Sequence, residues 1–248
     1  MEIVAVIPAR YASTRLPGKP LLAETGRPLI QHVVEAAGAS KRLSAIIVAT
    51  DDDRIAQAVR AFGGRVEMTR ADHPSGTDRV AEVAARMPSA GLFVNIQGDE
   101  PEIQASAIDR LVDVLAADHE AGMATLCTAI HDESIYRDPA CVKVVFGTSG
   151  RALYFSRSPI PCHRDGKPAG AVWGYLHLGI YAYRRDFLLG LAKRAVTPLE
   201  QCERLEQLRV LESGSPIALA VVDEPGVGID TPEDYARFVR RWRSRGGQ

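Results

Sequence analysis

Three cations lie close together near the N-terminus, at Arg10, Arg15 and Lys19 in the segment Pro8–Pro20. This segment directly follows the apolar run Ile3–Ile7, which predicts a buried strand. Three positive charges on one loop suit a polyphosphate, because stabilising phosphate chemistry depends on neutralising its charge. The segment contains neither GxxxxGKS/T nor GxGxxG, so the sequence indicates neither a P-loop nor a dinucleotide-binding turn. A basic surface loop without a ligand is the alternative interpretation.

Two aspartates lie where predicted elements begin or end. Asp99 follows the predicted strand Leu92–Gln97, and Asp230 precedes a helix that should begin at Thr231. Carboxylate oxygens are ligands that hard divalent cations prefer, so Asp99 and Asp230 predict a magnesium site for a metal–nucleotide complex. Turn formation at Asp99 and helix capping at Asp230 are the alternatives.

Other polar residues give weaker signals. Ser75 and Arg79 lie at the start of a predicted helix, where they could contact a base or a phosphate. His177 lies between Leu176 and Leu178 in a predicted strand, and a lone histidine there is more often structural. Glu206 and Gln207 fall within the predicted amphipathic helix Glu203–Glu212, for which a solvated polar face is the default interpretation.

Apolar runs alternate with amphipathic stretches along the first half of the chain. The predicted strands are Ile3–Ile7, Ala45–Thr50, Arg65–Met68 and Leu92–Gln97, and the predicted helices are Pro28–Ala39, Asp53–Phe62, Thr77–Arg86 and Ala105–Ala117. This alternation predicts an α/β fold with an open, mainly parallel sheet and helices on both faces. Ligands bind beyond the carboxyl ends of such strands, where the cations and Asp99 lie.

The second half predicts a smaller antiparallel β element. Its expected parts are a hairpin of Val142–Phe146 and Ala152–Ser156, a loop over Pro159–Gly174, a strand His177–Tyr183 and helices Phe187–Lys193 and Glu203–Glu212. We expect 1–248 to form a single domain, with parts 1–122 and 123–230 and a C-terminal helix in 231–248.

Composition restricts the partners and the compartment. The 248 residues carry a formal net charge of -1, which gives no overall cationic field for nucleic acid. The N-terminal apolar run is too short for stable membrane insertion, and the four cysteines include no CxxC pair. We therefore expect a cytoplasmic protein.

Several segments together resemble the Kdo cytidylyltransferases, also called CMP-Kdo synthetases. The segments are Ile7–Pro20, His73–Arg79, Asn95–Pro101, Ala152–Arg157, Leu178–Arg184, Leu205–Arg209 and Gly228–Asp234, in the family's order. The resemblance implies a nucleotide-diphospho-sugar transferase-like fold. It also implies a nucleotidyltransferase that moves CMP from CTP to the anomeric hydroxyl of Kdo (3-deoxy-manno-octulosonate), giving CMP-Kdo and pyrophosphate for lipopolysaccharide synthesis.

The resemblance also implies roles for individual residues. Asp99 and Asp230 would hold Mg²⁺, and Arg10, Arg15 and Lys19 would neutralise the triphosphate. Pro8, Ala9 and Arg10 through their backbone, with Ser75 and Arg79, would contact cytosine, whereas Gln97, Arg157, His177, Glu206 and Gln207 would receive the sugar. By the same implication 1–122 is mainly the CTP-binding half, 123–230 binds the sugar and forms the contact of a homodimer, and Arg157 pairs with the sugar carboxylate.

Three other functions stay open at this stage. Leu176 and Cys162 depart from the family's pattern on the acceptor side, so another acidic keto-sugar such as sialic acid is the alternative acceptor. A nucleotide sensor would need the basic loop but no pair of carboxylates. A metal-dependent glycosyltransferase would use a DxD turn, a pattern that is present at Asp51–Asp53 but is more typical of a helix start there.

Overall fold

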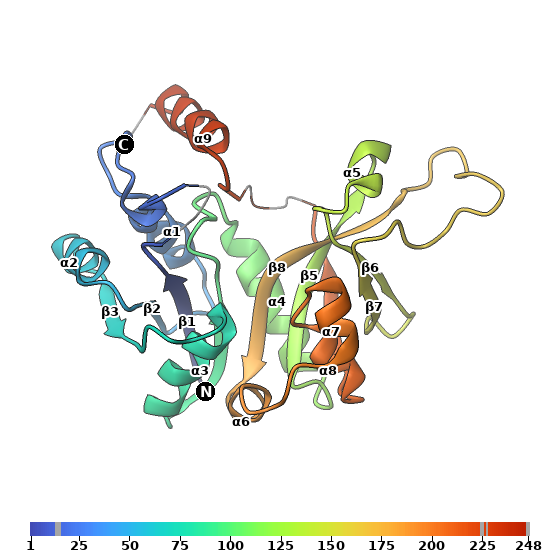
Figure 1. The fold of residues 1–248 in the computed structure, drawn as a ribbon, viewed down its shortest axis with the longest axis horizontal. Helices are drawn as coiled ribbons and strands as arrows, with labels where there is room; N and C mark the ends of the chain where they lie inside the picture. Colours follow the sequence, from blue (N-terminus) through green and yellow to red (C-terminus); the bar gives the residue numbers. More distant parts are fainter. Residues whose placement is uncertain (13–15, 224–225, 227, 247–248) are drawn as a thin grey trace. The chain divides into compact units, whose positions relative to one another are not determined.

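The computed structural model describes residues 1–12, 16–223, 226 and 228–246. The chain forms two compact units, Met1–Asp109 with Gly226–Gln248, and Arg110–Pro225 (Figure 1). The assignment of separate roles to 1–122 and 123–230 stays a prediction. In the part of the chain that the structure describes, no helix is both long enough and apolar enough to cross a bilayer.

The first unit contains a parallel sheet with the strand order β3-β2-β1-β4. The strands are β1 (Glu2–Ala9), β2 (Ala45–Thr50), β3 (Arg65–Met68) and β4 (Ala90–Asn95). Ala9 pairs with Thr50, and Thr50 pairs with Met68, so three strands end level with one another. The four predicted strands are confirmed, except that β4 ends at Asn95 and leaves Gln97 in the following turn.

Helices cover both faces of this sheet. The first unit holds η1 (Lys19–Leu21), α1 (Leu29–Gly38), α2 (Asp53–Ala61), α3 (Gly76–Arg86) and α9 (Pro232–Ser244), and α4 (Ala105–Ala117) crosses the boundary between the units. If Gly98 carried a Cβ atom, that atom would contact Ile7 of β1 and Ile30 of α1. If Gly76 of α3 carried one, it would lie 3.3 Å from Pro8 of β1. Successive residues of a strand point to opposite faces, so α1 and α3 cover opposite faces of β1. This arrangement confirms the predicted fold class.

Burial explains why the strand pattern was clear in the sequence. Val4, Ala5, Val6 and Ile7 of β1 are all 0% exposed. A strand covered on both faces has no solvated side, so its sequence is a continuous apolar run rather than an alternating one.

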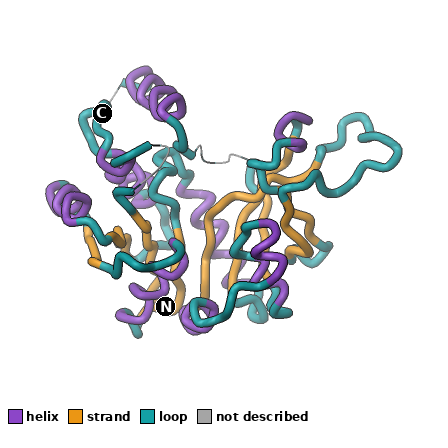
Figure 2. The backbone as a smooth tube through the Cα atoms, in the orientation of Figure 1, coloured by secondary structure: helices purple, strands orange, loops and turns teal. Residues whose placement is uncertain are grey.

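The second unit contains mostly antiparallel strands. They are β5 (Met123–Ile130), β6 (Lys143–Phe146), β7 (Ala152–Ser156), β8 (Gly174–Arg184) and β9 (Ile217–Val221). β8 pairs antiparallel with β5 and β6, β6 pairs antiparallel with β7, and β9 is parallel to β5. The predicted hairpin is confirmed. Between β7 and β8 the chain forms the predicted loop, drawn in teal in Figure 2.

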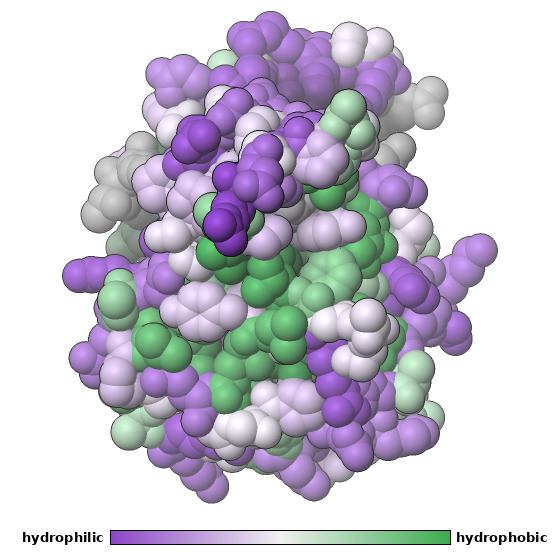
Figure 3. All heavy atoms as spheres, turned by 90° about the vertical axis from the view of Figure 1, so that its right-hand side faces the viewer, coloured by the Kyte–Doolittle hydropathy of each residue, from purple (hydrophilic) through white to green (hydrophobic). Residues whose placement is uncertain are grey.

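Short helices and an apolar face complete the second unit. The helices are α5 (Glu133–Arg137), α6 (Arg185–Leu191), α7 (Pro198–Glu203) and α8 (Leu208–Glu212). Figure 3 shows apolar side chains gathered on the side of the molecule where Figure 1 labels β6 and β7. Leu153 of β7 has 65% of its surface exposed.

The predicted helix Glu203–Glu212 is wrong as one continuous element, because only its second half is helical. α7 ends at Glu203, Arg204 adopts a left-handed conformation with φ 53°, and α8 begins only at Leu208. Leu205, Leu208 and Leu211 have helical spacing, but the chain leaves the helix at Arg204. The Arg157 Nε donates to the Glu203 carbonyl at 2.7 Å and so satisfies the last carbonyl of α7. Glu206 and Gln207 therefore lie in a turn.

Candidate active site

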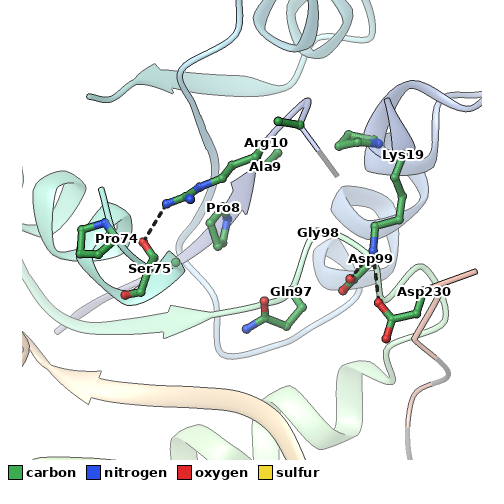
Figure 4. A pocket seen from close by; sticks show the side chains of 13 residues that line it. Pro8, Ala9, Arg10, Lys19, Pro74, Ser75, Gln97, Gly98, Asp99 and Asp230 are labelled. Atoms are coloured by element: carbon green, nitrogen blue, oxygen red, sulfur yellow. Dashed lines mark hydrogen bonds and ion pairs between the residues drawn. The ribbon is translucent and has the colours of Figure 1, made fainter. Parts of the chain in front are cut away.

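A pocket of about 460 Å³ lies beyond the carboxyl ends of the strands in the first unit (Figure 4). Its lining residues come from five separate segments of the chain. They are Pro8, Ala9, Arg10, Ala12, Lys19, Pro20, Pro74, Ser75, Gly76, Gln97, Gly98, Asp99 and Asp230. The structure thus brings together most of the residues that the sequence predicted for nucleotide and metal binding, and it adds Gln97 from the predicted sugar set.

The Lys19 ammonium lies between the two predicted metal ligands. Its Nζ is 2.6 Å from Asp99 Oδ2 and 3.6 Å from Asp230 Oδ1, and it donates to the Ile229 carbonyl at 2.8 Å. Figure 4 shows the three side chains converging on one point. The Lys19 side chain is 13% exposed, against 30% for Asp99 and 51% for Asp230, so the ammonium is the most enclosed of the three groups.

Backbone contacts hold the two aspartate turns together. The Ile229 N–H donates to the Asp99 carbonyl at 2.9 Å, which places the residue before Asp230 against the Asp99 turn. A Cβ on Gly98 would lie 2.9 Å from the Pro8 carbonyl oxygen, closer than Cβ atoms come to other atoms. Glycine at this position therefore lets the Asp99 turn approach the end of β1.

Asp234 orients the second aspartate. Its Oδ2 accepts hydrogen bonds from the backbone N–H of Asp230 at 3.1 Å and of Thr231 at 2.9 Å. Thr231 Oγ1 in turn accepts from the Asp234 N–H, which completes a capping box at the start of α9. Burial alone would raise the pKa of Asp234, but the hydrogen bonds from Thr231 and Asp230 outweigh it and lower the pKa. The spacing Thr-x-x-Asp could have indicated from the sequence that Asp234 belongs to a capping box. From the sequence, this segment was interpreted only as the start of a helix.

Arg10 and the start of α3 form the other end of the pocket. Arg10 Nη2 donates to the His73 carbonyl at 2.5 Å and to the Ser75 carbonyl at 3.4 Å. Ser75 Oγ accepts from the Asp78 N–H at 3.2 Å and is therefore the N-cap of α3. The pocket thus receives a guanidinium group and a helix N-terminus, both of which favour an anion.

Arg79, which was predicted to bind the nucleotide, lies elsewhere. Arg79 is fully buried, outside the pocket lining, with its guanidinium contacting Thr69 Oγ1 and lying 2.9 Å from Asp51 Oδ1. Burial lowers the pKa of Arg79, while the Asp51 carboxylate raises it. Its contact with cytosine stays a prediction, and Arg15 lies outside the described residues.

The other residues predicted to bind the sugar belong to the second unit. His177 lies within aromatic contact distance of Phe155 and Tyr181, and its Nε2 is 3.0 Å from Thr125 Oγ1. Part of the His177 surface remains accessible, yet burial of the ring lowers its pKa to about 3, so the imidazole is neutral at physiological pH. Gln207 is buried and accepts from the Tyr181 hydroxyl at 3.4 Å, whereas Glu206 is exposed.

Arg157 is held by backbone carbonyls. Its Nε donates to Glu203 O at 2.7 Å and its Nη1 to Pro139 O at 3.0 Å. The backbone N–H of Arg157 donates to the Glu203 carboxylate at 2.9 Å. Its predicted pairing with a sugar carboxylate is not tested by these contacts.

Comparison with known proteins gives the class and then the family. A pocket of cations and carboxylates beyond the strands of an α/β sheet suits a nucleotide. The cytidylyltransferase family model matches residues 4–217, which makes the chain a nucleotidyltransferase. A 3-deoxy-manno-octulosonate cytidylyltransferase of Geobacter metallireducens is 51% identical over 97% of this chain and 98% of its own length. The corresponding protein of Solibacter usitatus is 48% identical over 98% and 95%. The chain belongs to the 3-deoxy-manno-octulosonate cytidylyltransferase family.

Solved structures agree with this assignment. A CMP:2-keto-3-deoxy-manno-octonic acid synthetase complexed with CTP is 44% identical, with a TM-score of 0.93 over 99% of this chain and 100% of that one. A cytidylyltransferase from Leptospira borgpetersenii, 19% identical with a TM-score of 0.64, shares the fold.

Proposed function

We propose that the protein transfers CMP from CTP to the anomeric hydroxyl of Kdo, giving CMP-Kdo and pyrophosphate for lipopolysaccharide synthesis. The observation that carries the proposal is the convergence of Lys19, Asp99 and Asp230 in a pocket that Arg10 also lines. The names of the relatives and the CTP complex of the structural neighbour support the choice of nucleotide and sugar.

The residues of the pocket suit a displacement at the α-phosphorus. The sugar hydroxyl forms the new P–O bond, the bond to the β-phosphate oxygen breaks, and the electron pair leaves with pyrophosphate. Arg10 and Lys19 would neutralise the triphosphate and the departing pyrophosphate, with Arg15 in the same role. Because such transfer depends on positioning and charge, it requires no covalent bond to the protein.

Asp99 and Asp230 would hold Mg²⁺. The two carboxylates are close enough to share one cation, the Lys19 ammonium, so a divalent cation could be shared in the same way, in competition with the ammonium. Within the described ranges no three His, Cys, Asp or Glu side chains gather around a possible metal position, and Mg²⁺ is commonly held by one or two carboxylates plus substrate phosphates and water. When bound, the ion supplies charge stabilisation at the phosphate oxygens.

Substrate recognition would divide between the two sets of residues. The residues that would contact cytosine are Pro8, Ala9, Arg10, Ser75 and Arg79. Those that would receive the sugar are Gln97, Arg157, His177, Glu206 and Gln207. A neutral imidazole at His177 can accept or donate one hydrogen bond to a sugar hydroxyl without placing a charge there.

We further propose a cytoplasmic homodimer. CTP is a cytoplasmic nucleotide, which favours that compartment. The apolar face of the second unit, with Leu153 exposed on β7, supports a contact between two copies of this chain (Figure 3). Light scattering of the wild type and of Leu153→Asp tests the dimer, and a monomeric wild type would contradict it.

The direct test of the function is pyrophosphate release. CTP, ATP, GTP and UTP are each supplied with Kdo or with sialic acid, in Mg²⁺ or in EDTA. We expect release only with CTP, Kdo and Mg²⁺. Faster release with sialic acid would favour the alternative acceptor, and release that needs no sugar would sink the proposal. Asp99→Ala separates an enzyme from a nucleotide sensor, because the enzyme variant should lose release altogether.

A further inference from the structure

Lys143, the first residue of β6, carries a fully buried ammonium group. The residue is 0% exposed, and its Nζ donates to the carbonyls of Asp138 at 2.8 Å, Arg157 at 2.7 Å and Cys141. Three acceptors around one nitrogen use all three donors of an ammonium group, whereas a neutral amine has only two. Burial lowers the pKa of Lys143, whereas Cys141, Asp138 and Glu203 act to raise it.

This positive charge is not balanced by a carboxylate in contact with it. Among the described residues Lys143 makes no ion pair, and all its hydrogen bonds go to neutral carbonyl oxygens. The carboxylates of Asp138 and Glu203 act on the ammonium without bonding to it. Burying a charge that makes no ion pair is unfavourable, and a methionine of similar length would fill the same space without that cost. The charge therefore serves something other than packing.

The strand register places Lys143 beside two proposed acceptor residues. It pairs with Ser156 of β7 and with Leu176 of β8. Arg157 follows Ser156 and His177 follows Leu176, and the His177 N–H donates to the carbonyl of Val142, the residue before Lys143.

Lys143 and the Arg157 guanidinium both link the Asp138–Pro139 segment to the segment that contains Arg157. Lys143 binds the Arg157 carbonyl and the Asp138 carbonyl, and the Arg157 guanidinium binds the carbonyl of Pro139, the next residue. Glu203 is the carboxylate that contacts this group, since it accepts from Ser156 Oγ at 2.6 Å and from the Arg157 N–H at 2.9 Å. The Asp138 carboxylate also raises the pKa of Lys143, so two cations and two carboxylates meet here.

We propose that Lys143 is a positioning residue for the acceptor. It holds the backbone carbonyls of Arg157 and Asp138, and so fixes the position of the Arg157 guanidinium, whose charge favours a sugar bearing a carboxylate over a neutral one. The assignment rests on the proposed function and names a residue through which that function selects an acidic acceptor.

The test compares Lys143→Met with Lys193→Met, which removes an exposed lysine of the same unit. Initial rates give the KM for Kdo, for its neutral 1-carboxamide and for CTP. We expect Lys143→Met to raise the KM for Kdo about tenfold, as for the loss of about 1.4 kcal/mol of interaction, with the KM for CTP unchanged. The preference for Kdo over the carboxamide should shrink by a similar factor, which a merely structural role would not cause. Lys193→Met should behave as the wild type.

An unchanged preference in a folded Lys143→Met protein, or an equal loss in Lys193→Met, would overturn the assignment. If Lys143→Met does not fold, the wild type is labelled with ¹⁵N-lysine and its slowly exchanging ammonium signal is followed by NMR. That signal should shift on adding Kdo and stay in place with the carboxamide, and no shift with Kdo would equally overturn the proposal. A wild type that releases no pyrophosphate from CTP and Kdo would instead refute the proposed function.

Discussion

Lys19→Met should change catalysis and metal binding in opposite directions. The Lys19 ammonium is 2.6 Å from Asp99 and 3.6 Å from Asp230, and it is well enclosed. Methionine keeps the length of the side chain and removes the charge. If Lys19 stabilises charge on the phosphates, its loss should lower kcat by roughly 10²–10³-fold, the range for removing one such donor.

The same change should tighten the binding of a free divalent cation. A hydrogen bond to a charged group contributes about 1.5–3 kcal/mol, and in the wild type a cation that binds both aspartates must compete with the ammonium. Asp230 is 51% exposed, so solvent screens part of this interaction and the lower value applies. The expected gain in affinity is therefore about tenfold.

Both effects can be measured on the same protein preparation. Free Mn²⁺ is titrated by electron paramagnetic resonance without nucleotide, and pyrophosphate release gives kcat. Lys41→Met, which removes an exposed lysine of the same unit, should match the wild type in both assays. Weaker or unchanged Mn²⁺ binding in Lys19→Met would refute the inference that the ammonium and the metal share the two carboxylates, and an unchanged kcat would refute its role at the phosphates.

Three further predictions concern stability. Asp51→Asn leaves the buried Arg79 guanidinium without its counter-charge and should lower the free energy of unfolding by about 3 kcal/mol in urea; a loss below about 1 kcal/mol would contradict the pairing. Thr231→Ala should lower the free energy of unfolding by about 1 kcal/mol, because it removes the N-cap of α9. The folded pKa of Asp234 is lowered, so its stabilisation should be present above about pH 4 and disappear as the pH falls through that pKa. A free energy of unfolding that does not change with pH in acid would argue against this. Burial lowers the pKa of His177 to about 3, so as the pH falls this histidine is protonated in the unfolded chain before it is protonated in the folded one. The contribution of His177 to the free energy of unfolding should therefore decrease as the pH falls from about 6.5 towards 3. The ring signals of His177 in NMR should stay those of neutral imidazole at pH 5, and a protonated ring there would show this prediction to be incorrect.

The first unit shows how much could be predicted from local sequence. Strands buried on both faces produce apolar runs that are visible without a structure, and a parallel sheet brings their carboxyl ends to one edge. Residues that follow those runs, such as Arg10 and Asp99, were therefore expected to lie near one another, and the pocket contains both. The family resemblance was confirmed by relatives about half identical over nearly the whole chain.

The second unit shows where local patterns were insufficient. β5 and β9 were not predicted, because short apolar runs fit buried strands and buried helices equally well. α5 and α7 were not predicted as separate elements, because helices of 5 and 6 residues are too short to show a helical period. The leucine spacing around Glu206 fits a helix, yet the chain leaves the helix at Arg204, and Arg157 binds the last carbonyl of α7.

The sequence by itself determined the α/β class, the positions of the cations and carboxylates at element ends, and the family. Only the tertiary structure decided which of these groups meet. The Lys19 ammonium bridges Asp99 and Asp230, which lie 80 and more than 200 residues further along the chain, while Arg79 is buried against Asp51 outside the pocket. Element types follow from local periodicity, but contacts between distant side chains depend on strand register and helix packing, which no local pattern contains.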